Sequence, residues 1–121
     1  EGFENSTRLE LRSPDPVANP YLAFSVMLAA GLKGLEDRLE PPEAMEDDIF
    51  ELSPAELAER NITTLPEDLN EAVNLTEGSA LMREALGDHV FEKFIENKRI
   101  EWDQWRQQVT DYELKRYLPV L

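Results

Sequence analysis

Cysteine is absent from the 121-residue sequence, and histidine occurs only once. Without cysteine the chain forms no disulfides and has no thiol chemistry. The single histidine, His89, stands where we expect a helix to begin. A lone histidine at such a position is more often a surface or capping residue than a catalyst, so we assign it no role.

Basic residues and long apolar runs are also scarce. Lysine and arginine number 12 against 26 acidic residues, which gives a net charge of −14. This charge argues against nucleic acid or an anionic membrane as the main partner. No stretch approaches the roughly 20 apolar residues of a membrane span, and no signal peptide is recognisable. We therefore expect a cytoplasmic protein without nucleic-acid or membrane partners.

The acidic excess lies mostly in the middle of the chain. Residues 36–77 hold 14 acids and 2 bases, and such a run is usually a solvated face or an exposed excursion. Its cluster Glu46, Asp47 and Asp48 lacks the glycine and terminal glutamate of an EF-hand, so it predicts no calcium site. With 41% apolar residues, the whole chain has the composition of a globular domain.

Residues 8–12 alternate strictly between charged and apolar side chains: Arg8, Leu9, Glu10, Leu11 and Arg12. In a β-strand the three charged side chains would share one face and the two leucines the other. The following Pro-Asp-Pro, residues 14–16, would end the strand because proline cannot donate to a sheet ladder. A charged stripe of this kind is often only a solvated face, with ion pairs worth about 0–1 kcal/mol. The alternation thus predicts a strand but leaves its role open.

Behind this strand we expect helices. Asn19 is a good N-cap and Pro20 a favoured first residue for a helix over residues 19–40, whose nearly all-round apolar first half predicts burial. Residues 41–87 predict short acidic helices in a peripheral subdomain, including a capping box at Ser53 and Glu56. A long helix should run from Asp88 to about residue 109.

The end of the chain predicts subunit contacts. A second capping box, Thr110 with Glu113, should start a terminal helix. The stretch 88–121 carries both tryptophans and an apolar tail, which is more than a monomer usually exposes.

Residues 6–32, STRLELRSPDPVANPYLAFSVMLAAGL, resemble the catalytic-domain signature of class I glutamine synthetases. In that family an Arg-x-Glu-x-Arg strand runs into a Pro-Asp-Pro turn and an Asn-Pro-Tyr-Leu helix start. The resemblance continues to Leu121, so the chain is similar to the last quarter or so of that enzyme. Because the chain also begins at Glu1 without an initiator methionine, we expect a fragment of a longer protein.

The resemblance implies an activity, ATP-dependent ligation of ammonia to L-glutamate through γ-glutamyl phosphate, in nitrogen assimilation. It implies that Glu10 is a ligand to Mg²⁺ or Mn²⁺ and that Arg8 approaches the phosphates of ATP. Arg12 would be catalytic and would bind the glutamate substrate and its transferring phosphoryl group. The family's other metal ligands lie upstream in a whole enzyme, so we expect this piece alone to be inactive.

The same resemblance implies a fold and an assembly. The fold is α+β: a mostly helical C-terminal segment of the catalytic domain, residues 1–121, with one N-terminal strand that joins a sheet from the missing part. We divide it into an active-site strand and turn (1–16), a buried helix (19–40), acidic peripheral helices (41–87) and C-terminal helices for subunit contacts (88–121). The implied assembly is a dodecamer of two hexameric rings, with a PII-type or other nitrogen-regulatory protein as a possible partner.

One alternative from another class stays open. The acidic middle, the aromatic C-terminal region and the incomplete site would also suit a non-catalytic helical interaction or regulatory module. Such a module would not need the charged alternation of residues 8–12 followed by the Pro-Asp-Pro turn.

Overall fold

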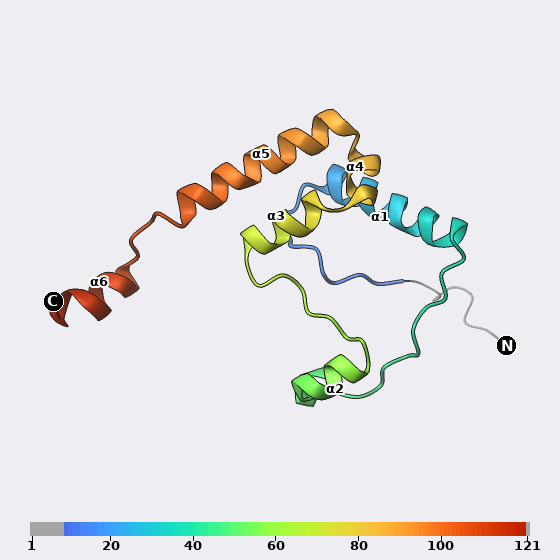
Figure 1. The fold of residues 1–121 in the computed structure, drawn as a ribbon, viewed down its shortest axis with the longest axis horizontal. Helices are drawn as coiled ribbons and strands as arrows, with labels where there is room; N and C mark the ends of the chain where they lie inside the picture. Colours follow the sequence, from blue (N-terminus) through green and yellow to red (C-terminus); the bar gives the residue numbers. More distant parts are fainter. Residues whose placement is uncertain (1–8, 121) are drawn as a thin grey trace.

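The computed structural model describes residues 9–120, which form a chain of helices joined by extended segments (Figure 1). In chain order the elements are α1 (Pro20–Glu36), the 3₁₀ turn η2 (Ile49–Glu51), α2 (Pro54–Glu59), α3 (Leu69–Glu77), α4 (Ala80–Leu86), α5 (Asp88–Trp105), α6 (Asp111–Tyr117) and the 3₁₀ turn η3 (Leu118–Val120). None of these helices is both long and apolar enough to cross a membrane.

The predicted α+β fold class is wrong for the described residues, because no strand occurs between residues 9 and 120. Residues 9–13 form no backbone–backbone hydrogen bond with any residue between 9 and 120. Alternating side chains create the two faces of a strand, but a strand also needs a neighbouring backbone to pair with. Leu9 and Leu11, which would form the apolar face of the predicted strand, are exposed.

Helix α1 begins where the sequence predicts. The side-chain oxygen of Asn19 accepts hydrogen bonds from the backbone N–H groups of Tyr21 (3.0 Å) and Leu22 (3.4 Å), and Pro20 occupies the first turn. These contacts satisfy two of the free N–H groups at the helix start.

Helix α1 ends at Glu36, earlier than the predicted residue 40. Arg38 adopts a left-handed backbone with φ of 53° and donates its N–H to Leu35 O (3.2 Å). The N–H of Leu39 then bonds Gly34 O (3.0 Å). This pair of bonds is a Schellman motif, which closes the helix before the two prolines at residues 41 and 42 can do so.

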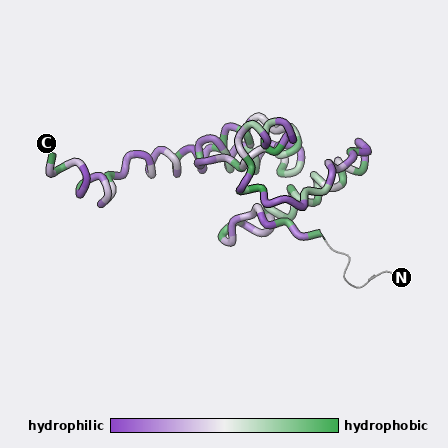
Figure 2. The backbone as a smooth tube through the Cα atoms, turned by 90° about the horizontal axis from the view of Figure 1, so that it is seen from below, coloured by the Kyte–Doolittle hydropathy of each residue, from purple (hydrophilic) through white to green (hydrophobic). Residues whose placement is uncertain are grey.

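None of the residues of α1 is buried in this chain, although its composition predicts a buried helix. Tyr21 is 82% exposed, and Phe24 and Leu28 are about two-thirds exposed. Figure 2 shows hydrophobic colour along much of α1 and hydrophilic colour at its C-terminal end. Helix α4 packs against one side of α1, and the side that carries Tyr21, Phe24 and Leu28 stays exposed within residues 9–120.

The core lies where α3, α4 and α5 meet. Val73, Phe91 and Ile95 are buried there, and the partly buried residues packed against them are Leu69, Met82, Leu86 and Phe94. Phe91 and Ile95 lie one turn apart on α5, so they present one apolar stripe to α3 and α4. Helix α1 packs against α4. The short helices α3 and α4 therefore contribute to the core of the described residues.

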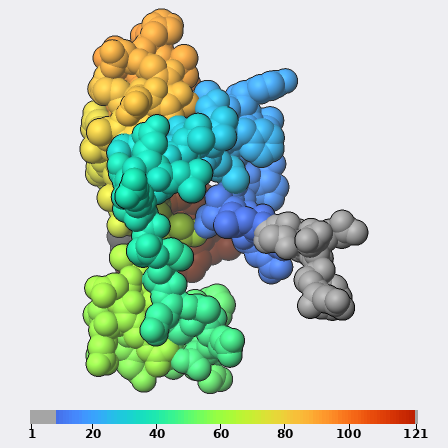
Figure 3. Space-filling model, turned by 90° about the vertical axis from the view of Figure 1, so that its right-hand side faces the viewer, coloured from blue at the N-terminus to red at the C-terminus, as the bar shows by residue number. Residues whose placement is uncertain are grey.

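Two parts of the described chain do not pack against this core. Residues around α2 form a separate lobe, which is the green region at the bottom of Figure 3. Helix α6 lies beyond the far end of α5 and packs with η3 (Figure 1). Helix α1 is therefore held against the core through α4. Helices α2 and α6 do not pack against the core helices.

Candidate functional site

The predicted site residues lie on the extended segment that precedes α1. The guanidinium Nε of Arg12 donates to Glu10 Oε1 at 2.6 Å, and their side chains are 86% and 52% exposed. The structure therefore brings these two predicted residues together, and Arg8 lies outside the described residues. The sequence predicted that Glu10 and Arg12 share a face, but it did not predict that they bind each other.

The Pro-Asp-Pro turn connects this segment to α1. Asp15 Oδ1 accepts the backbone N–H of Val17 (2.8 Å), and Asp15 O accepts that of Ala18 (2.9 Å). The next residue, Asn19, caps α1. Consecutive hydrogen bonds from Asp15 to Asn19 fix the direction in which residues 9–13 leave the helix. Sequence reasoning treated Asp15 only as part of a turn; its position between two prolines is the signal for this side-chain role.

An open groove of about 650 Å³ lies beside the turn. One wall is the turn and the first half of α1, and the other comes from α3, α4 and α5, including Met82 and Phe94. Its one cation is Lys98, whose ammonium group bonds Glu101 at 2.5 Å. The side chains that line the groove are mostly apolar. The groove therefore does not provide a charged binding site.

A metal site cannot be completed by the described residues alone. Glu10 offers carboxylate oxygens, the ligands that Mg²⁺ and Mn²⁺ prefer. Within residues 9–120, however, no group of three or more acidic or histidine side chains comes together. Glu10 fits the chemistry of one ligand, and the others would have to come from elsewhere in a complete enzyme.

Comparison with known proteins identifies the family to which the chain belongs. Residues 2–117 match the family model described as "Glutamine synthetase, catalytic domain". The chain belongs to the glutamine synthetase family. The match includes the whole segment from Arg8 to Arg12 and the turn that follows it.

Individual glutamine synthetases are similar over nearly the whole chain. The protein from Methanosarcina mazei is 49% identical over 117 residues, which are 97% of this chain and 26% of that protein. Those from Methanococcus maripaludis and Mycobacterium tuberculosis are 47% and 46% identical over 114 residues, or 94% of this chain and 26% of each protein. The chain thus spans about a quarter of the length of the curated relatives it matches.

Proposed function

We propose that the chain works as the C-terminal part of an enzyme that joins ammonia to L-glutamate at the expense of ATP. The observation that carries this proposal is the family match across residues 2–117, which includes the Arg-x-Glu-x-Arg segment. In the proposed reaction the γ-carboxylate of glutamate takes the γ-phosphoryl group of ATP and releases ADP. Ammonia then attacks the resulting acyl phosphate, and inorganic phosphate leaves with formation of L-glutamine.

The two described site residues have suitable chemistry for this reaction. Glu10 would provide one hard oxygen ligand to Mg²⁺ or Mn²⁺, which offsets phosphate charge during phosphoryl transfer. Arg12 would bind the glutamate substrate and the transferring phosphoryl group, because its planar guanidinium can donate two parallel hydrogen bonds. Arg8 would approach the phosphates of ATP by the same chemistry.

The ion pair between Glu10 and Arg12 is compatible with these roles. Both side chains are more than half exposed, and such pairs typically contribute about 0–1 kcal/mol. Separating them therefore costs little. In the complete enzyme Glu10 would be free to ligate a cation while Arg12 turns to an anionic substrate, and each group would retain a partner of opposite charge.

We further propose a homo-oligomer, a dodecamer of two hexameric rings, in the cytoplasm. Trp102 and Trp105 stack with ring centroids 5.2 Å apart, and Trp105 is 64% exposed. Tyr117, Leu118 and Val120 are exposed as well, on a helix that lies away from the core. Apolar groups in this number support burial against another subunit. A PII-type or other nitrogen-regulatory protein would be a possible regulator.

The alternative, a non-catalytic helical interaction module, is supported by the uncovered apolar surface of α1 and by the single carboxylate of the site. Activity distinguishes the two. The gene's full-length product should form glutamine from glutamate and ammonia in a strictly ATP-dependent assay, while residues 1–121 alone should form none. A full-length product that makes no glutamine with either Mg²⁺ or Mn²⁺ would favour the interaction module.

A further inference from the structure

The residues around α2 form an independent acidic unit. We call residues 41–62 the acidic module; it contains η2 and α2 and is joined to the core by extended chain on both sides. The helix packing of the core involves α1, α3, α4 and α5 and leaves the acidic module as a lobe of its own (Figure 3). Its surface is therefore available for contacts that do not disturb the core.

The acidic module holds one aromatic side chain outward. Phe50 is 99% exposed, yet its backbone is fixed in η2. The carboxylate of Asp48 accepts the N–H of Phe50 at 3.0 Å, and Asp48 O accepts that of Glu51 at 3.1 Å. Because the backbone at Phe50 is already ordered, binding there would cost little backbone freedom, and aromatic side chains often anchor protein interfaces.

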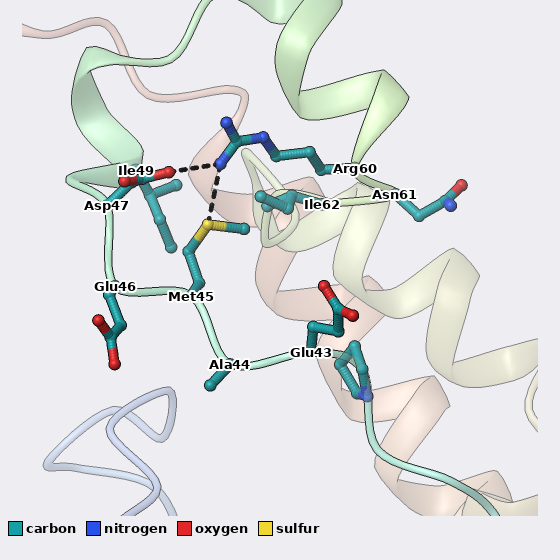
Figure 4. Close-up of a pocket in the computed structure, with 10 residues that line it drawn as sticks. Glu43, Ala44, Met45, Glu46, Asp47, Ile49, Arg60, Asn61 and Ile62 are labelled. Carbon is teal, nitrogen blue, oxygen red and sulfur yellow. Dashed lines mark hydrogen bonds and ion pairs between the residues drawn. The ribbon is translucent and has the colours of Figure 1, made fainter.

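A groove of about 800 Å³ lies next to η2 (Figure 4). Its apolar lining includes Met45, Ile49 and Ile62. Arg60 holds the two walls together: its Nη1 bonds Asp47 Oδ2 at 2.7 Å and lies 3.2 Å from the sulfur of Met45. Methionine adapts its shape to many partners, so a lining of this kind suits a bound side chain.

The charge of the acidic module determines which partner fits. Residues 41–62 contain seven acids and one base, and that base, Arg60, is already paired with Asp47. Within the described part of the chain, Glu43, Glu46 and Glu51 form no ion pair. A second copy of this face would bring together two surfaces of the same sign, which is unfavourable. A segment rich in lysine or arginine would instead find complementary charge.

From these observations we propose that the acidic module is a docking site for a cationic, amphipathic segment of another protein. Phe50 is the apolar anchor, the groove beside it takes an apolar side chain of the partner, and the free carboxylates form the rim. This proposal does not depend on the proposed reaction.

A synthetic peptide can test this proposal on the full-length protein. The probe is a helical peptide of about 15 lysine and leucine residues with one apolar face. Its control has the same composition in an order that leaves no apolar face. Fluorescence anisotropy at about 0.15 M salt should show tighter binding of the amphipathic peptide than of its control. Phe50→Ala should weaken that binding by about tenfold or more, and Leu65→Ala, an exposed apolar residue outside the acidic module, should leave it unchanged.

Charge variants separate specific docking from general attraction. Replacing both Glu46 and Glu51 by Gln should weaken binding and reduce its salt dependence, whereas the same change at Glu40 and Glu67 should have a smaller effect although it removes equal charge. The proposal is overturned if neither peptide binds, if both bind equally, or if Phe50→Ala binds like the unmodified protein. It is also overturned if Phe50→Ala alone changes the oligomeric state, because the face would then be an interface between copies.

Discussion

Ser53 and Glu56 show how far individual residues can be predicted. The Glu56 carboxylate accepts hydrogen bonds from the Ser53 N–H (2.8 Å) and hydroxyl (2.6 Å), and the Glu56 N–H reaches the Ser53 oxygen at 3.4 Å. This is the predicted capping box, and Thr110 with Glu113 forms the second one. Both predictions are confirmed because a capping box needs only residues three apart. The direct bond between Arg12 and Glu10 was not predicted, since alternation indicates a shared face and not a contact.

The capping box at Ser53 gives a pH prediction. The Ser53 hydroxyl and N–H hold the pKa of Glu56 below its usual value. A depressed folded-state pKa means that the stabilisation is present above the unfolded-state pKa and is lost as the pH falls through the folded-state pKa. Carbon-13 NMR titration of the Glu56 carboxyl in the 121-residue chain should therefore give a midpoint below that of an ordinary glutamate.

Ser53→Ala is the matched variant for this titration, because it removes the hydroxyl donor and leaves the carboxylate in place. The Glu56 midpoint should move upward toward the ordinary value in this variant. An unchanged midpoint would show that the Ser53 hydroxyl does not set the pKa.

The ends of the helices differ in how well the sequence indicates them. Helix α2 is followed by Asn61 in the left-handed region, a residue type that is common there. At the end of α1 the same position is taken by Arg38, which carries no such signal. The start of α1 was predicted from its cap, but its end depends on a backbone conformation that arginine rarely adopts.

The predicted strand failed for a different reason. Pairing partners for residues 9–13 are not present in the rest of the described chain, and alternation alone cannot supply them. The predicted burial of α1 also needs partners: within residues 9–120, α4 packs against one side of the helix and the side with Tyr21 and Phe24 stays exposed. The helix caps were therefore predictable from neighbouring residues, whereas the strand needed a pairing partner that residues 9–120 do not contain.

Phe91 allows a test of the core with a control of the same chemistry. It is 1% exposed, and the guanidinium of Arg83 lies 4.4 Å above its ring. Phe91→Ala should cost about 3–5 kcal/mol, which is close to the whole stability of a small domain. We expect the 121-residue chain carrying this change to lose its cooperative urea transition.

Phe50→Ala makes the identical substitution at a side chain that is 99% exposed. Its free energy of unfolding should stay within about 0.5 kcal/mol of the unmodified chain. Equal effects at the two positions would mean that the core does not lie around Phe91.

At the scale of the whole molecule, the exposed apolar side chains of the C-terminal region allow a test of the proposed dodecamer. Deleting residues 117–121 from the full-length protein removes the apolar tail but leaves the segment 8–12 and α1 intact. If the tail holds two rings together, the truncated protein should form single hexamers that still bind ATP. An apolar anchor can contribute about 2 kcal/mol, and repetition around a ring multiplies its effect.

Native mass spectrometry at low micromolar concentration measures this directly. Lys115→Ala is a suitable control, because it changes an exposed residue of α6 without removing an apolar group. A truncated protein that remains a full dodecamer would leave the tail without this role.

The chain belongs to a glutamine synthetase catalytic domain, and we propose that Glu10 is a ligand to a metal ion there. Glu10→Gln removes one negative charge and nearly preserves the shape of the side chain. Glu40→Gln is the control, because it makes the same change in the loop after α1.

The decisive measurement is the rate of glutamine formation by the full-length protein as Mg²⁺ is titrated. If Glu10 binds the metal ion, Glu10→Gln should lose most of its turnover and need a higher Mg²⁺ concentration for half of its maximal rate, while Glu40→Gln should follow the unmodified enzyme. A Glu10→Gln enzyme with an unchanged rate and an unchanged Mg²⁺ curve would contradict it.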